Sequence, residues 1–124
     1  MQKVKEVMNR RVITIPADME LKKICNILSK NSLSGVPVVD MNNKLIGFVS
    51  ERDIVSTVAS GESEKKQAKH IMCRRLITVT EDTLLSKVTK IFADHPFRHI
   101  PVVKKGEVVG IISRRDIAST FFSS

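Results

Sequence analysis

Tryptophan and tyrosine are absent from this chain of 124 residues, and aromatic residues make up only 4% of it. A hydrophobic core must therefore be aliphatic, and an apolar content of 42% supplies enough side chains for one. Few aromatic side chains also leave little for stacking on unpaired bases, which weighs against a sequence-specific RNA-binding module.

Cysteine is scarce as well. Cys25 and Cys73 form no CxxC motif, so neither a zinc site nor a disulfide framework is indicated. We expect Cys25 to be buried on the apolar side of a helix. No apolar run approaches the ~18 residues that span a membrane, and the start lacks the apolar stretch of a signal peptide. Reduced thiols would suit a cytoplasmic protein, which is the predicted location.

Acidic residues are outnumbered, 13 against 21 Lys and Arg, which gives a formal net charge of +8. This balance favours an anionic partner such as a nucleotide, a nucleic acid or an acidic surface. A solvated basic surface with no partner would have the same composition, so charge alone does not choose between these.

The chain carries an internal repeat. The stretches Pro37–Val39 and Gly47–Ile54 return as Pro101–Val103 and Gly110–Ile117. The spacing is 64 residues before the turn near Asn42 and 63 after it, so one residue is lost there. A unit of about sixty residues is marginal alone. We therefore predict one compact module made of a first repeat (1–60), a linker (61–69) and a second repeat (70–124).

Each repeat is predicted to run strand, helix, strand, strand, helix. In the first, a strand over Val12–Ile15 precedes a helix capped by Asp18, with Leu21, Ile24, Cys25 and Leu28 on one face. Strands over 36–39 and 45–49 then form a hairpin, and Ser50 opens a helix with Ile54, Val55 and Val58 on its apolar side.

The second repeat is expected to follow the same order. Thr78 falls in its first strand and Asp82 is the expected helix cap. Strands over Ile100–Val103 and Val108–Ile112 lead to a last helix that begins at Arg114.

The motif Ser-x-x-Asp occurs at the start of the last helix in both repeats, as Ser50/Asp53 and Ser113/Asp116. One interpretation is a capping box, in which each side chain bonds the other residue's backbone N–H. The other is a ligand site, because a helix N-terminus attracts phosphate and arginines (Arg52, Arg114, Arg115) stand inside the motifs. Spacing alone favours the capping box.

The two copies, in this order and spacing, resemble a tandem pair of CBS domains, the family named for cystathionine β-synthase. The resemblance spans residues 4–120. It implies an α+β fold of two βαββα repeats packed about a pseudo-twofold axis, with a cleft that holds AMP, ADP, ATP, S-adenosylmethionine or a relative as a regulatory ligand. No cofactor is required.

Carried over by position, the resemblance assigns ligand-binding roles to matching residues of both repeats. The aspartates correspond to residues that hold the ribose hydroxyls, and the Val-Pro and Ile-Pro stretches to those beside adenine. The first set is Thr14, Ile15, Gly35, Val36, Pro37, Ser50, Arg52 and Asp53; the second is Thr78, Val79, Arg98, His99, Ile100, Pro101, Ser113, Arg114, Arg115 and Asp116.

The two sets differ in charge. Gly35 and Glu51 of the first repeat correspond to His99 and Arg114 of the second. We expect the second site to suit a polyanionic phosphate, and the first to hold a less charged ligand or none.

The resemblance implies a ligand sensor that regulates a separate protein, and no enzyme, since no nucleophile–base pair, P-loop or metal motif is present. It also implies a homodimer, whose expected helix faces carry Ile54, Val58, Ile117, Phe121 and Phe122. A nucleic-acid-binding module and a dimerisation module without a ligand remain the alternatives; no membrane contact is expected.

Overall fold

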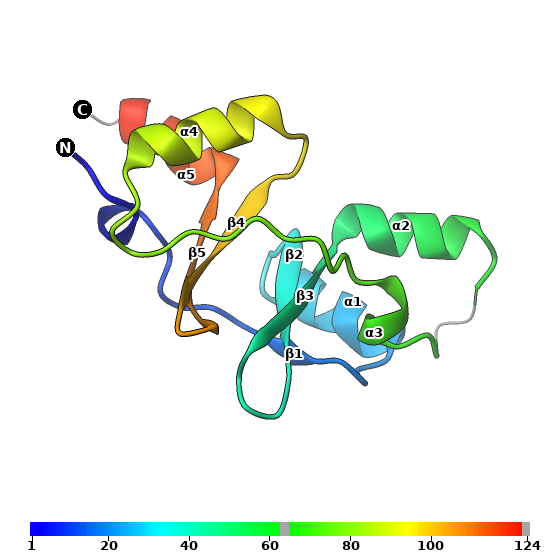
Figure 1. Ribbon diagram of the computed structural model, residues 1–124. Helices are drawn as coiled ribbons and strands as arrows, with labels where there is room; N and C mark the ends of the chain where they lie inside the picture. The colour runs from blue at the N-terminus through cyan, green and yellow to red at the C-terminus, as the bar shows by residue number, and fades with distance from the viewer. Residues whose placement is uncertain (63–64, 123–124) are drawn as a thin grey trace. The chain divides into compact units, whose positions relative to one another are not determined.

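The computed structural model describes residues 1–62 and 65–122 (Figure 1). Two compact units emerge from its contacts. The continuous unit is Ile13–Leu76, and the split unit joins Met1–Val12 to Ile77–Ser124. Both contain helices and strands, as the predicted fold class requires. Ser63 and Glu64 of the predicted linker lie outside the described residues.

The continuous unit is built around a three-stranded sheet, β1 (Ile15–Pro16), β2 (Gly35–Val39) and β3 (Leu45–Ser50), in that order. Strand β1 runs parallel to β2, and β2 runs antiparallel to β3. The helices are α1 (Leu21–Lys30), α2 (Glu51–Ala59) and the short α3 (Ala68–Ile71). The core is aliphatic, as the composition predicted: Ile15, Ile24, Leu28, Val36, Val38, Val49 and Ala68.

The split unit contains a short 3-10 helix, η1 (Val4–Glu6), and the antiparallel hairpin β4 (His99–Lys104) and β5 (Glu107–Ser113). Helices α4 (Leu85–Asp94) and α5 (Arg114–Phe122) complete it (Figure 1). Its core contains Val4, Met8, Val79, Leu85, Val88, Phe92, Ile100, Val102, Ile112 and Ile117.

The segment before the first strand of each repeat packs on the core of the other repeat. Val4 and Met8 lie at the start of the first repeat but belong to the split-unit core, while Ala68, at the end of the linker, belongs to the continuous-unit core. The backbone bonds match: Val4 N donates to Thr83 O (2.9 Å), and Ala68 N donates to Met19 O (2.8 Å). The core of each unit therefore includes side chains from a segment that adjoins the other repeat in the sequence.

A glycine in the last strand of each hairpin makes room for this segment. A Cβ on Gly47 would stand 2.3 Å from Met72 Sδ, and one on Gly110 would stand 2.6 Å from Met8 Sδ. Real Cβ atoms do not approach so closely, so a side chain here would displace the methionine. The repeated glycine thus serves packing in both units.

The predicted aspartate caps of α1 and α4 are wrong. Helix α1 begins after Glu20, whose side chain makes no cap bond, and Leu21 N donates instead to Lys66 O at 2.7 Å. Leu85 N likewise donates to Gln2 O at 2.9 Å. A carbonyl from a distant segment therefore takes the place of a local side-chain cap.

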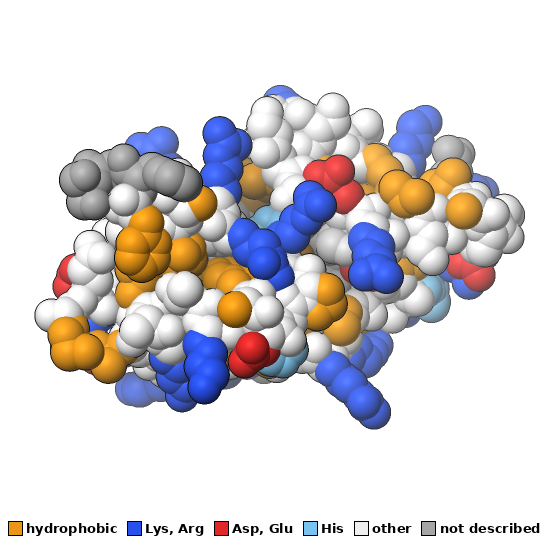
Figure 2. All heavy atoms as spheres, turned by 90° about the horizontal axis from the view of Figure 1, so that it is seen from above, with side chains coloured by type: hydrophobic (Ala, Val, Ile, Leu, Met, Phe, Trp, Pro, Cys, Tyr) orange, Lys and Arg blue, Asp and Glu red, His pale blue; other side chains and the backbone are white. Residues whose placement is uncertain are grey.

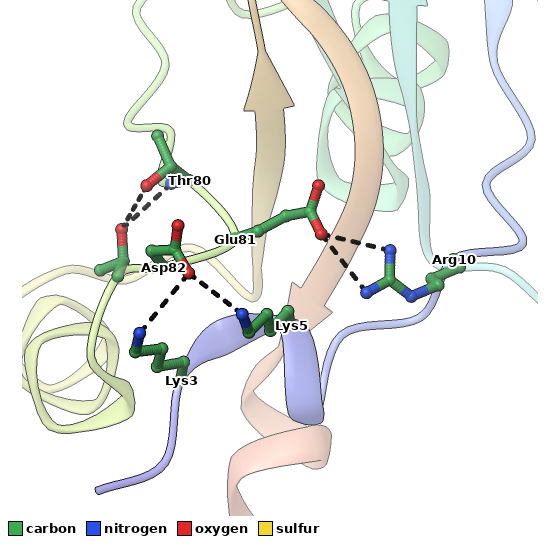
Figure 3. A network of polar contacts seen from close by, with 7 residues as sticks. Lys3, Lys5, Arg10, Thr80, Glu81 and Asp82 are labelled. Atoms are coloured by element: carbon green, nitrogen blue, oxygen red, sulfur yellow. Dashed lines mark hydrogen bonds and ion pairs between the residues drawn. The ribbon is translucent and has the colours of Figure 1, made fainter.

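Asp82 is engaged in ion pairs instead. Its Oδ1 lies 3.3 Å from Lys5 Nζ and 3.6 Å from Lys3 Nζ, and Arg10 Nη2 lies 3.4 Å from Glu81 Oε2 (Figure 3). The hydrogen bond and charge of Lys5, aided by Lys3, lower the pKa of the exposed Asp82 carboxyl. These contacts tie the N-terminal segment to the loop before α4, although exposed ion pairs contribute little to stability.

The predicted first strands are shorter than expected. In the continuous unit only Ile15 of Val12–Ile15 lies in β1, and Pro16 belongs to this strand. In the split unit Thr78 lies outside any strand, and Val79 forms a single parallel bridge with Val102. Ile15 and Val79 nevertheless each contribute a buried aliphatic side chain to the core of their unit. The sequence pattern therefore predicted the position of each first strand but not its length.

Two residues of the predicted apolar side of α2 are exposed. Val55 is 66% exposed and Val58 60% exposed, whereas Thr57 is buried and its hydroxyl donates to Asp53 O at 2.8 Å. A threonine can be buried here because the hydroxyl is hydrogen-bonded within the helix. The valines leave an apolar stripe on the surface of α2.

The single-residue difference between the repeats lies in the hairpin turns, as predicted. In the first, Asp40 Oδ1 accepts from Asn42 N and Lys44 N, and Asn43 has a φ of 63°. In the second, a tighter turn has a positive φ at both Lys105 (52°) and Gly106 (81°). Two central residues with positive φ are typical of a two-residue hairpin turn.

The two cysteines should react at different rates. Cys25 is half-buried rather than fully buried, and burial raises the pKa of its thiol, whereas Cys73 is exposed. Because the thiolate is the nucleophile, Ellman's reagent near neutral pH should label Cys73 first and Cys25 several-fold more slowly. In Cys73→Ser only the slow phase should persist; persistence of the fast phase would contradict the assignment.

Candidate functional site

The Ser-x-x-Asp motifs form capping boxes in both units. Ser50 N donates to Asp53 Oδ2 at 2.9 Å, and Asp53 N donates to Ser50 Oγ at 3.2 Å. In the split unit Ser113 N donates to Asp116 Oδ2 at 2.8 Å, and Asp116 N donates to Ser113 Oγ at 3.1 Å. The capping interpretation is confirmed, and its bonds fix the orientation of each carboxylate.

Capping leaves one carboxylate oxygen available on each aspartate. The bonds that the two carboxylates accept all end on Oδ2, and within residues 1–62 and 65–122 no hydrogen bond to Oδ1 is present. Both aspartates are half-buried. A fixed, partly accessible carboxylate oxygen can accept a hydrogen bond from a hydroxyl such as that of a sugar.

The hairpin register of the continuous unit separates the predicted site residues onto two faces. Val36 pairs with Val49, and both point into the core. Gly35 pairs with Ser50, and Pro37 with Phe48, so these four lie on the opposite face. The side chains of Val36 and Ile15 are therefore enclosed in the core, and only their backbone could reach a ligand.

The split unit repeats this division. Ile100 pairs with Ile112 in the core, while His99 pairs with Ser113 and Pro101 with Ile111 on the other face. A backbone bond from Arg114 N to Arg98 O (3.1 Å) ties the helix start to the strand start, as Glu51 N to Ser34 O (2.9 Å) does in the first repeat. Each unit therefore has one cradle, defined as this second hairpin face with its Ser-x-x-Asp box. Gly35, Pro37 and Phe48 on this face are also buried, as is Pro101 in the split unit.

The two cradles differ at a position that the sequence reasoning missed. A Cβ on Gly35 would stand 2.5 Å from Phe48 Cε1, so the Phe48 ring lies against the glycine. The matching pair in the split unit is His99 and Ile111. The alternation of side chains after Gly47 could have predicted that Phe48 lies on this hairpin face. It could not have predicted that the Phe48 ring contacts Gly35.

The remaining predicted residues surround these faces. Arg52, Arg98 and Arg115 are exposed, Thr14 is half-buried and Thr78 exposed. Val79 is enclosed in the core, where its N–H donates to Pro101 O at 3.1 Å. The first set of predicted site residues thus falls within the continuous unit and the second within the split unit.

Arg114 has partners of its own. Its Nε donates to Phe97 O at 2.9 Å, its Nη2 donates to His95 O, and its guanidinium carbon stands 5.6 Å from the centre of the Phe92 ring. The guanidinium is thus held on the loop that follows α4, although the sequence suggested a phosphate partner.

Neither a metal centre nor a membrane span is found in the part of the chain that the structure describes. No group of three or more His, Cys, Asp or Glu side chains there could hold a metal ion. No helix there is both long and apolar enough to cross a bilayer.

The repeated hairpin with its Ser-x-x-Asp box can be compared with known proteins. The family model of the CBS domain matches this chain twice, over residues 4–60 and 68–123. The chain belongs to the CBS domain family. A crystal structure of the CBS domain pair of protein MJ0100, in complex with 5′-methylthioadenosine and S-adenosyl-L-methionine, is 29% identical. It superposes with a TM-score of 0.92, covering 99% of this chain and 98% of that one.

Other relatives have varied lengths. The chain is 28% identical to an uncharacterised 17.7 kDa protein of Acidianus ambivalens, over 94% of this chain and 71% of the relative. The CBS domain-containing protein YhcV of Bacillus subtilis is 25% identical, over 95% and 84%. Inosine-5′-monophosphate dehydrogenase of Aquifex aeolicus is 32% identical over 85% of this chain, which spans only 21% of that enzyme. Most of the enzyme therefore has no counterpart in the CBS pair.

Proposed function

We propose that this CBS pair is a regulatory module that binds an adenosine-type ligand and transmits its presence to a separate protein. The observation that carries the proposal is the pair of fixed aspartates, each bonded to a serine that lies on the same hairpin face as a proline. Support comes from the 29% identical CBS pair of MJ0100, whose crystal structure contains two adenosine compounds. Catalysis is not proposed, because the Ser and Asp of each motif are engaged with each other as a helix cap.

Each cradle offers the groups that a nucleoside needs. Asp53 and Asp116 would accept hydrogen bonds from ribose hydroxyls through Oδ1. The backbone of Gly35–Pro37 and of His99–Pro101 would lie beside adenine, with Ser50 and Ser113 at the end nearest the helix N-terminus. That N-terminus favours negative charge, so a phosphate or carboxylate of the ligand would be directed toward it.

We propose that the cradles have different ligands. The split unit carries Arg98, His99 and Arg115 around its cradle, which suits AMP, ADP or ATP. In the continuous unit Phe48 lies against Gly35, and Ser34 and Gly35 stand where the split unit has Arg98 and His99. This cradle suits a ligand with less negative charge, such as S-adenosylmethionine or 5′-methylthioadenosine.

Signalling requires that the ligand bind one arrangement of the protein better than another, because an equilibrium shifts only by this difference in affinity.

We also propose a homodimer that covers exposed apolar side chains of α2 and α5. These exposed side chains include Val55 and Val58 of α2 and Phe121 of α5, which is 64% exposed. Ile117 is buried in the core, Ile54 is half-buried, and the side chain of Phe122 lies outside the described residues.

A thermal-shift panel tests the function directly. At 100 times its Kd, a ligand specific for the folded state stabilises it by about 2.7 kcal/mol, which raises the melting temperature by several degrees. AMP, ATP, S-adenosylmethionine and 5′-methylthioadenosine are the probes, with cytidine monophosphate as a matched control. Absence of any shift with millimolar adenosine ligands would reject the proposal.

The alternative of nucleic-acid binding has one observation in its favour. Figure 2 shows scattered Lys and Arg side chains and fewer Asp and Glu side chains, in keeping with the net charge of +8. Binding of RNA or DNA that falls steeply with salt and is unaffected by adenosine ligands would support this alternative.

A further inference from the structure

The loops that follow α1 and α4 close in different ways. After α1, Ser32 adopts a left-handed conformation with a φ of 53°. The turn lets Leu33 N donate to Leu28 O (2.9 Å), next to the last helical bond from Asn31 N to Ile27 O (3.1 Å). The backbone therefore caps its own helix, as left-handed residues at helix C-termini commonly allow.

The matching loop after α4 cannot use this solution, because Pro96 stands where Ser32 stands in the first repeat. Proline fixes φ near −65° and has no N–H to donate. It also drives the preceding residue out of the helical region, and His95 is extended, with a φ of −134° and a ψ of 150°. One side-chain contact is shared, since both Asn31 Nδ2 and His95 Nδ1 lie within hydrogen-bond distance of the carbonyl four residues back.

Arg114 supplies the donors that this loop lacks. Its Nε and Nη2 reach the carbonyls of Phe97 and His95, on either side of the proline. Its guanidinium also covers the Phe92 ring, which meets Phe97 edge-on at 6.2 Å between centroids. The side chain of His95 stacks on Phe97 at 5.1 Å, so the arginine closes a small aromatic cluster.

The first repeat has neither half of this arrangement. Where the second has Pro96 and Arg114, the first has Ser32 and Glu51, and an acidic side chain could not donate to loop carbonyls. The two differences therefore compensate each other: the proline removes the backbone cap, and the arginine replaces it with a side-chain one.

We propose that Arg114 is a positioning residue of the split-unit cradle and not a phosphate ligand. By holding His95 and Phe97 it fixes the start of β4, where Arg98 and His99 follow directly. Moving it to a phosphate would leave the two loop carbonyls without this donor. This inference rests on the proposed function, and it assigns phosphate contacts to Arg98 and Arg115.

The test compares adenosine with ATP, using the full chain. Arg114→Lys keeps the charge but loses the planar fork that reaches both carbonyls. We expect it to weaken adenosine and ATP alike, by about five- to tenfold, and to speed hydrogen exchange of the amides at 95–99. Arg115→Gln, one residue away, should weaken ATP and leave adenosine nearly unchanged.

Rescue distinguishes positioning from general damage. Adding Pro96→Ser to Arg114→Lys restores the backbone cap of the first repeat, and should return both adenosine affinity and exchange protection toward wild type. The proposal is overturned if Arg114→Lys leaves adenosine binding and the 95–99 amides unchanged, or if Pro96→Ser rescues neither. Wild type that binds neither adenosine nor ATP would instead reject the proposed function, while the exchange measurement would still decide the role of Arg114.

Discussion

Starting the chain at Met8 should destabilise residues 77–124, although the removed segment is joined to the other end of the chain. The deletion takes Val4 out of the split-unit core, together with Gln2 O and the N–H groups of Val4 and Lys5 that bond to the loop before α4. Burying a valine contributes about 1.5–3 kcal/mol, and each backbone bond about 0.5–1.5 kcal/mol. The expected loss is about 3–7 kcal/mol, a large part of the stability of a small domain.

Hydrogen exchange followed by mass spectrometry locates the loss. Exchange should accelerate first in α4, β4 and β5, and less in α1 and β2, which follow the deletion in sequence. Val4→Ala should show the same pattern at about 1–2 kcal/mol, since it removes roughly two methylene equivalents. Glu6→Ala, at an exposed position of the same segment, should change stability by less than about 0.5 kcal/mol. Faster exchange confined to residues 13–60 would contradict the segment exchange between units.

Replacing Asp116 by asparagine should weaken binding of AMP or ATP about 10- to 100-fold while the protein stays folded. A hydrogen bond to a charged group contributes about 1.5–3 kcal/mol, and the asparagine carbonyl cannot replace a carboxylate toward two ribose hydroxyls. The helix cap should survive, because an amide oxygen still accepts from Ser113 N. Calorimetry measures the affinity, and thermal unfolding checks the fold.

Two matched variants carry the same chemical change elsewhere. Asp53→Asn alters the continuous-unit cradle and should affect AMP or ATP less than Asp116→Asn does, because its surroundings carry less positive charge. Asp40→Asn alters a carboxylate that closes a hairpin turn and should leave ligand affinity unchanged. Equal losses from Asp53→Asn and Asp116→Asn would refute the proposed difference between the cradles.

Much of the architecture could be predicted from local pattern, because local chemistry determines it. The hairpins follow from apolar strands on either side of turn residues, and the capping boxes from Ser-x-x-Asp. Because Ser-x-x-Asp occurs twice in the same context, it is a stronger signal than a single copy would be. The position of the lost residue could also be found, since a turn tolerates a deletion that a paired strand does not.

The wrong predictions have a common cause in contacts between segments far apart in sequence. Asp18 and Asp82 were reasonable helix caps, but carbonyls of Lys66 and Gln2 take that place. Periodicity alone also did not reveal whether the same chain covers the apolar face that carries Val55 and Val58. The carbonyls that accept from Arg114 belong to a loop 17–19 residues earlier, so its neighbours in the sequence did not reveal them.

The N-terminal segment Met1–Val12 also sets an order of events during synthesis. Residues 13–76 are contiguous, so the continuous unit can fold once they have left the ribosome. Met1–Val12 emerges before them, yet the core that it completes includes Ile112 and Ile117, which emerge after them. Val4 and Met8 therefore remain without these partners while the continuous unit is made. The split unit can close only when Met1–Val12 meets the later residues, which makes its formation the late, non-local step of folding.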